Sequence, residues 1–243
     1  MRQVADNVFS LGSRAHNFYL IVESEELTVV DAGCVREWPK LVRALRRLEI
    51  DLGRIIGFAI THVHGDHFGM AGRAREEKRR VAVHVEDEPR ARGTYQGRFA
   101  AEASDLPVFR PAVLRNFLPM LASGVTSMPH VEDVETFEDG QRLDLPGYPV
   151  VVHTPGHTEG HSMFHCPDLG VLFTGDGVVT MDLLGSTTGP QMMDRVFHVD
   201  SHQALTSLDR LRDIDASLLL PGHGRPWRGT PAEAADLARS RDF

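Results

Sequence analysis

Three imidazoles and a carboxylate lie within six residues in the segment His62-x-His64-x-Asp66-His67. Imidazole and carboxylate are ligands that Zn²⁺ and related first-row metals accept. The segment follows an apolar stretch, so a loop after a strand can turn these side chains toward one point. One metal ion does not comfortably use four ligands this close together in sequence, and the motif therefore indicates two metal ions that share a site.

Further donors come from three later segments, which read TPGHTEGH, LFTGD and LLLPGHG. They supply His157, Asp176 and His223, each at the end of an apolar strand or just after a Pro-Gly turn. A carboxylate has two oxygens and can bridge two cations, which an imidazole cannot do. Asp176 therefore suits the position between two metals.

The elements that must position these donors alternate between strands and helices. Apolar periodicity and turn residues predict strands at residues 4–13, 16–24, 27–33, 55–60, 81–85, 134–139, 141–145, 148–154, 161–166, 171–176 and 217–222. Helices are predicted at residues 38–48, 70–79, 112–121 and 201–212, and from residue 231 onward. The strand and helix order in both halves predicts two sheets packed between outer helices.

Composition indicates one folded unit. The chain has 243 residues, of which 42% are hydrophobic and 25% charged, values typical of a globular domain. We expect a single domain over residues 1–243, in which the Pro-rich segment 86–130 is an insertion that forms either a lid, a substrate wall or a plain surface loop.

Charge and hydropathy limit the partners. The formal net charge of -8 gives no basic footprint, which argues against nucleic acid or an anionic membrane as partner. The sequence shows no signal-peptide pattern and no apolar run long enough for a membrane span, so we expect a cytoplasmic protein with a small-molecule substrate. Cys34 and Cys166 are too few for a disulfide framework. The sequence leaves open whether the protein forms a homo-oligomer.

The ordered motifs THVHGDH, TPGHTEGH, TGD and PGHG resemble those of the metallo-β-lactamase-fold hydrolases. The resemblance runs from VVDAG at residue 29 to PGHG at residue 224 and implies an α/β fold, a four-layer αββα sandwich. It implies that His62, His64 and His157 bind one metal, that Asp66, His67 and His223 bind the second, and that Asp176 bridges them. It also implies that Asp31 supports the histidine loop rather than binding metal.

The chemistry that this resemblance implies is hydrolysis by a hydroxide that bridges two divalent ions. Zn²⁺ is the expected metal, and Fe²⁺ or Mn²⁺ would suit the same donors. Two cations lower the pKa of a shared water enough to supply hydroxide near neutral pH, and one of them polarises the substrate carbonyl. Asp66 is the candidate catalytic residue that orients the nucleophile and passes a proton to the leaving group.

Departures from known relatives narrow the substrate. A cysteine-type β-lactamase needs Cys where Asp176 stands, and the acyl-homoserine lactonases place Tyr where this chain has Val179. Glyoxalase II carries a helical carboxy-terminal domain, whereas only some 20 residues follow His223 here. We expect a hydrolase for an ester, thioester or lactone with an apolar acyl group, held by segments 86–130 and 177–199.

Three alternatives remain open. A glyoxalase II-like thioesterase without the helical domain is one. A persulfide dioxygenase-like enzyme with a single non-haem iron is another, although the Arg-containing stretch of those enzymes is replaced here by GVVTMDLLGSTTGP. A non-catalytic metal-binding protein is the third. His161 and His198 receive no metal role, but His161 lies four residues after His157, and His198 could reach the site from its loop.

Overall fold

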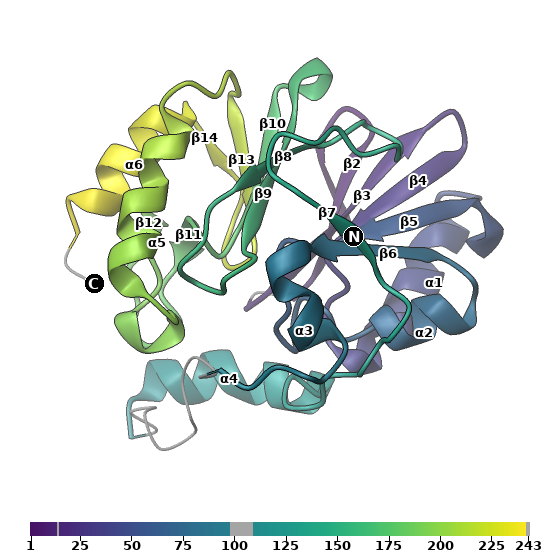
Figure 1. Ribbon diagram of the computed structural model, residues 1–243, viewed down its shortest axis with the longest axis horizontal. Helices are drawn as coiled ribbons and strands as arrows, with labels where there is room; N and C mark the ends of the chain where they lie inside the picture. Colours follow the sequence, from purple (N-terminus) through teal and green to yellow (C-terminus); the bar gives the residue numbers. More distant parts are fainter. Residues whose placement is uncertain (14, 98–108, 242–243) are drawn as a thin grey trace.

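Two β-sheets pack face to face, and helices cover both outer faces, in the computed structural model of the chain (Figure 1). The structure describes residues 1–13, 15–97 and 109–241. The first sheet has the strand order β1-β2-β3-β4-β5-β6-β7. These strands span Arg2–Ala5, Val8–Gly12, Asn17–Glu23, Glu26–Val30, Ile55–Ala59, Arg80–His84 and Glu135–Phe137. The strands from β1 to β4 pair antiparallel, and those from β4 to β7 pair parallel.

The second sheet has the strand order β14-β13-β10-β9-β8. Its strands, in chain order from β8, are Val150–His153, Ser162–Cys166, Val171–Gly175, Leu218–Pro221 and Trp227–Arg228. Only β10 and β13 pair in parallel. The strands β11 (Val179–Met181) and β12 (Thr188–Gln191) form a separate antiparallel pair.

Helices α1 (Trp38–Arg47) and α2 (Ala71–Glu76) cover the first sheet, and α5 (Ser201–Ser207) and α6 (Pro231–Arg239) cover the second (Figure 1). In α1, Leu41, Ala44 and Leu45 recur at the three- and four-residue spacing of a helix face and are buried, while the intervening arginines face outward. This arrangement confirms the predicted αββα sandwich. Two more helices, α3 (Glu88–Ala91) and α4 (Pro111–Ser123), follow β6, and α4 lies across one end of the sandwich (Figure 1).

Three apolar clusters hold the layers together. One lies between α1, α2 and the first sheet, and another between α5, α6 and the second sheet. The central cluster joins the two sheets through side chains such as Tyr19, Ile21, Phe164, Phe173 and Leu220. Each fully buried side chain of this size contributes roughly 1.5–3 kcal/mol, so the sandwich is a rigid base for the loops at its edge.

Several predicted elements differ from the structure. Residues 4–13 form two strands, β1 and β2, because the chain turns at Asn7, whose φ is 60°. The strand predicted at residues 141–145 is wrong: that segment makes only an isolated bridge between Arg142 and Val150. The helix predicted to Arg212 ends at Ser207 and continues as a 3-10 turn. Residues 98–108 of the expected insertion lie outside the described residues. Among the described residues, no helix is long and apolar enough to cross a membrane.

Candidate metal centre

The candidate ligands meet at one edge of the two sheets because strands that run in the same direction end there. The histidine loop follows β5, Asp176 follows β10, and His223 comes two residues after β13. In the parallel pair, Gly175 of β10 lies beside Pro221 of β13, so Asp176 and His223 become neighbours. His157 reaches the same edge from the loop between β8 and β9. The structure thus brings together all seven residues that the sequence analysis names as ligands.

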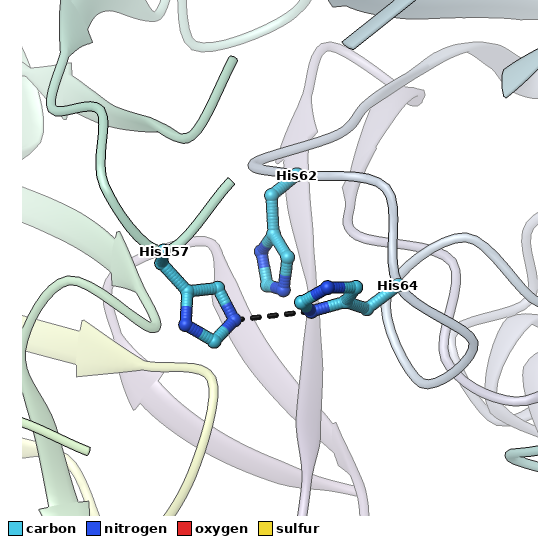
Figure 2. Close-up of side chains that lie close together, drawn as sticks. All are labelled: His62, His64 and His157. Carbon is cyan, nitrogen blue, oxygen red and sulfur yellow. Dashed lines mark hydrogen bonds between the residues drawn. The ribbon is translucent and has the colours of Figure 1, made fainter. Parts of the chain in front are cut away.

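The first group consists of His62, His64 and His157, whose rings converge from two separate loops (Figure 2). One ring nitrogen from each residue lies within 4.8 Å of the others. His157 Nε2 and His64 Nδ1 face each other at 3.0 Å. His62 and His157 are buried and His64 is half-buried. Three imidazole nitrogens in this arrangement suit one divalent ion.

The second group consists of Asp66, His67 and His223, again with ligand atoms within 4.8 Å of one another. Asp176 stands between the two groups. One carboxylate oxygen, Oδ2, lies 3.5 Å from His157 Nε2 and 3.0 Å from His223 Nε2. The other, Oδ1, lies 3.5 Å from His67 Nε2. A single carboxylate therefore contacts donors of both groups, as a bridging ligand would.

Four buried atoms of the candidate ligands have no hydrogen-bond partner among the described residues: His157 Nδ1 and, at the point where the two groups meet, His62 Nε2, His67 Nε2 and Asp176 Oδ1. Burying a polar atom without a partner costs about 1–3 kcal/mol, and three such atoms converge on one point here. Imidazole nitrogens and a carboxylate oxygen that lack other partners are the donor set of a metal site. The residues present therefore fit a pair of divalent ions.

Asp31 fixes the histidine loop from behind. Its Oδ1 accepts hydrogen bonds from the Thr61 amide at 2.8 Å and the Thr61 hydroxyl at 2.9 Å, and its Oδ2 accepts from His67 Nδ1 at 2.8 Å. These contacts leave His67 Nε2 as the nitrogen that faces the centre. Asp31 itself has a φ of 64°, a conformation that is costly for a residue other than glycine.

The loop before β3 holds His223. His223 Nδ1 donates a hydrogen bond to the Ala15 carbonyl, so its Nε2 points at Asp176. Asn17 Nδ2 donates to the carbonyls of Pro221 at 2.9 Å and Gly224 at 2.8 Å. Gly222 is required here, because a Cβ at this position would overlap Asp176 Oδ1 and come within 2.6 Å of the His67 ring.

Burial and neighbouring carboxylates divide the histidines into two classes. Burial, together with the adjacent imidazoles, lowers the pKa of His62, and burial lowers that of His64 to about 4, so both rings are neutral as ligands must be. Burial also opposes the charged form of His67, but Asp176, Asp66 and Asp31 outweigh it and raise its pKa to about 10. Asp176 likewise raises the pKa of His223 against the effect of burial. The carboxylates around His67 and His223 make this side of the centre anionic, and this is the side that attracts cations.

Asp87, which the sequence analysis did not single out, joins the two histidine loops. Its fully buried carboxylate accepts hydrogen bonds from the Val63 amide at 2.9 Å, the Thr158 hydroxyl at 2.8 Å and the Gly160 amide at 2.9 Å. Val63 lies between His62 and His64, and Thr158 follows His157. Asp87 therefore fixes the distance between the loops. Nothing local predicts this role, since the surrounding EDEP reads as an exposed charged turn.

His161 has a positioning role that its place four residues after His157 suggested only weakly. Its Nε2 accepts hydrogen bonds from the backbone amides of Asp176 and Gly177, both at 3.1 Å. Its Nδ1 donates to the Thr154 carbonyl at 3.1 Å. The ring thus fixes the backbone that carries Asp176. His198 is also buried, donates from Nε2 to the Met193 carbonyl at 3.1 Å, and stacks edge-on against His157.

A pocket of about 220 Å³ opens over the centre. Its floor includes His64, Asp66, His157, Asp176 and His223, and its walls are apolar. These walls come from both segments that the sequence analysis expects to bind substrate: Phe117, Met120 and Val125 from segment 86–130, and Leu183, Met193 and Phe197 from segment 177–199. The rings of Phe117 and Phe197 stack at 6.3 Å, which joins α4 to the other wall.

The arginines of segment 86–130 that the structure describes do not line this pocket. Arg90 is fully buried, donates to Glu159 Oε2 at 2.7 Å, and lies 3.7 Å over the Tyr95 ring. It supports the loop that carries His157 rather than facing a substrate. Among the described residues, the pocket therefore has apolar walls and no arginine in its lining.

Comparison with known proteins agrees with this geometry. A family model described as the metallo-beta-lactamase superfamily matches residues 11–223. The probable metallo-hydrolase YflN of Bacillus subtilis is 26% identical over 93% of this chain and 87% of its own length. The acyl-coenzyme A thioesterase MBLAC2 of Gallus gallus is 29% identical over 90% of this chain and 76% of its own.

Solved structures show the same fold. The crystal structure of TTHA1623 in a di-iron-bound form aligns with a TM-score of 0.62 and 25% identity, over 96% of this chain and 98% of that one. The matched residues 11–223 include every candidate ligand from His62 to His223. The chain therefore belongs to the metallo-β-lactamase superfamily and is a hydrolase of that superfamily.

Proposed function

We propose that this protein is a dinuclear metal-dependent hydrolase that cleaves an ester, thioester or lactone bond of a small molecule, and that a thioester with an apolar acyl group is the preferred substrate. The observation that carries the proposal is a set of buried ligand atoms without a hydrogen-bond partner among the described residues, His62 Nε2, His67 Nε2 and Asp176 Oδ1. They belong to a centre whose Asp176 lies on the floor of an apolar pocket. A pocket that joins metal ligands to apolar walls suits an acyl group bound with its carbonyl at the metals.

Each ligand has a defined place in this proposal. His62, His64 and His157 would hold one divalent ion, and Asp66, His67 and His223 would hold the other, with Asp176 shared. Zn²⁺ is the expected metal, and iron is a real alternative because TTHA1623 binds two iron ions in this fold. Two such ions supply an activated water and a Lewis acid for the substrate carbonyl.

Asp66 is the proton carrier in the reaction. Its carboxylate is mostly buried and its Oδ2 lies 3.5 Å from His223 Nε2 and 3.6 Å from His67 Nε2, while the residue also lines the pocket. In hydrolysis the water oxygen bonds to the carbonyl carbon, the bond to the leaving group breaks, and one proton of water must reach that leaving group. Asp66 accepts this proton and donates it to the departing thiolate or alkoxide.

The apolar walls favour an acyl group. The pocket volume of about 220 Å³ accommodates a short or medium acyl chain, and Phe117, Met120 and Met193 can adjust to its shape. The name of MBLAC2 identifies that relative as an acyl-coenzyme A thioesterase, and this supports a thioester over a lactone for the present chain.

Metal content and a substrate panel test the proposal together. Protein purified without chelator is analysed by elemental mass spectrometry and assayed with esters, thioesters, lactones and a phosphodiester that share apolar groups. We expect close to two metal equivalents and fastest turnover of a thioester. One equivalent of iron with oxygen uptake would instead indicate a dioxygenase, and cleavage of the phosphodiester alone would refute the acyl substrate.

A further inference from the structure

A second cavity, of about 700 Å³, lies beside the metal centre. Its walls come from β1 and β2 of the first sheet, from the β11–β12 pair, and from residues 224–227 after β13. The pocket over the metals measures about 220 Å³, roughly a third of this volume. Ligand sites for molecules of drug or cofactor size occupy about 300–1,000 Å³, so this second cavity is large enough for a sizeable organic group.

The charge of this cavity is opposite to that of the chain. The protein carries 34 acidic residues against 26 lysines and arginines, yet no aspartate or glutamate is among the described residues that line the cavity. Arg2 and Arg225 are both exposed and line it. A small hollow next to it shares Met1 and Leu11 and adds the side chains of Lys40, Arg43 and Arg47. A basic surface surrounded by an acidic protein attracts anions.

The rest of the lining suits a flat ring. Trp227 is half-buried in the wall, and Leu11, Met181 and Pro226 are further apolar residues of the lining. Tryptophan stacks on planar bases, an interaction of about 1–3 kcal/mol in nucleic-acid-binding proteins. Arginine binds phosphate groups with charge-assisted hydrogen bonds. The two arginines can bind the phosphates of a phosphorylated nucleoside, and the tryptophan can stack on its base.

Only one wall separates this cavity from the metals. Gly224, which lines the cavity, follows His223 directly, and the Thr180 amide donates to the His223 carbonyl at 2.9 Å. Met181 lines the cavity and also packs in the apolar cluster of Met120 and Met193, which line the pocket over the metals. The two cavities thus adjoin the same short segments, around residues 180–181 and 223–224, although no described residue lines both. A molecule whose reacting bond lies at the metals must pass around these segments to reach the second cavity.

We propose that this cavity binds the anionic nucleotide end of a thioester substrate, as in a coenzyme A thioester, while the acyl group occupies the pocket over the metals. This proposal rests on the proposed function, and it identifies the leaving group of the reaction as a thiol that carries a nucleotide. Arg225 and Arg2 bind the phosphates, and Trp227 stacks on the base. The cavity therefore determines which leaving group is accepted, and the metal pocket determines which acyl group is accepted.

Binding without turnover tests the site. Adenosine 3′,5′-bisphosphate is titrated by calorimetry into the metal-loaded full chain and into the variants Arg225→Glu and Arg228→Glu. Arg228 is exposed, lies three residues further along the chain, and does not line the cavity, so it controls for the change in net charge. We expect Arg225→Glu to weaken binding about tenfold or more, and Arg228→Glu to change it less than about twofold. Arg2→Glu is a second variant that we expect to weaken binding of the bisphosphate.

Kinetics separate this proposal from the proposed function. A coenzyme A thioester and the same acyl group on pantetheine are compared as substrates. We expect Arg225→Glu to raise KM for the former about tenfold with kcat unchanged, and to leave the latter unaffected. If the bisphosphate does not bind, or binds both glutamate variants equally, the cavity proposal is overturned even where thioesters are hydrolysed. Bisphosphate binding that depends on Arg225, without thioester hydrolysis, would support the cavity and overturn the substrate.

Discussion

Among the residues that the structure describes, two buried clusters contain the residue types of a metal site, but they differ in hydrogen bonding. At the metal centre, His62 Nε2, His67 Nε2 and Asp176 Oδ1 have no hydrogen-bond partner among the described residues. In the second cluster, His16, Cys34 and Glu37 also bring their ligand atoms within 4.8 Å of one another. There, His16 Nε2 lies 2.5 Å from Glu37 Oε2, which also accepts from the Cys34 amide at 3.1 Å.

The difference shows that residue types alone do not identify a metal site. Glu37 binds His16 and Lys40, and although burial opposes its charge, these partners lower its pKa to about 2. Burial raises the pKa of the Cys34 thiol, which disfavours the thiolate that a metal needs. The second cluster is satisfied by its own members. It supports the loop whose Ala15 carbonyl holds His223, and so it acts as a brace for the metal centre.

The largest expected effect belongs to the metal centre. His157→Ala removes a ligand nitrogen and Asp66→Asn removes the proton carrier, so we expect each to lower turnover by roughly 10³-fold or more. Circular dichroism should show an intact fold, because both side chains lie in loops at the sheet edge. Turnover close to that of the unmodified protein in either variant would refute the assignment.

The brace should matter for stability rather than for metal content. The pKa of Glu37 is about 2 in the folded state against 4.5 as its ordinary value, which corresponds to about 3 kcal/mol. Because the folded value is the lower one, this stability is present above about pH 4.5 and is lost as the pH falls toward 2. Denaturant unfolding at several pH values measures it, and Glu37→Gln should lose the stability at neutral pH and flatten this dependence. If Glu37→Gln lost a metal equivalent, the His16, Cys34 and Glu37 cluster would contribute to metal binding, and the contrast with the metal centre would be wrong.

Asp87 should give an intermediate effect, because it acts on the metal centre through the loops. Asp87→Asn replaces one acceptor oxygen with an amide that faces the donors Val63 N–H, Thr158 O–H and Gly160 N–H. We expect metal affinity to fall about 10- to 100-fold, measured by competition with a coloured chelator. Asp168→Asn on the exposed surface is the matched control. Equal affinity in the two variants would show that Asp87 has no positioning role.

The smallest effect is expected at Cys34. Its thiol lies 3.8 Å from His16 Nε2 and makes no stronger contact with that ring. Cys34→Ala should retain both metal equivalents and full turnover, and should lower the unfolding free energy by only about 1 kcal/mol through the small cavity left behind. Elemental analysis that showed one equivalent fewer would make this cluster a metal site after all.

The residues of the candidate metal centre could be named from the sequence because their signals are local. His62, His64, Asp66 and His67 lie within one loop, and Pro-Gly turns mark the ends of the strands before His157 and His223. The positioning residues depend on tertiary contacts and leave no such pattern. His223 is held by Ala15, 208 residues away, and Asp87 reaches Gly160 across 73 residues.

The fold class was likewise predictable, whereas some edges of the sheets were not. Buried strands such as β5 and β10 consist almost entirely of apolar residues and are recognisable from composition. The β11–β12 pair was missed because Thr188, Gly189 and Pro190 are typical of a loop, and only pairing with Val179–Met181 makes this segment a strand. Residues 141–145 alternate as a strand would, but the turn at Pro146 and Gly147 leaves them a single bridge.

The two histidine loops, which face each other across 93 residues at His64 and His157, have a consequence for how the protein matures. During synthesis the first loop emerges early with four donors, but its partners after β8, β10 and β13 emerge much later. Until the last of these strands has joined its sheet, the growing chain offers only a weak and incomplete set of ligands. We therefore expect metal ions to bind late, only after both halves of the chain have folded together.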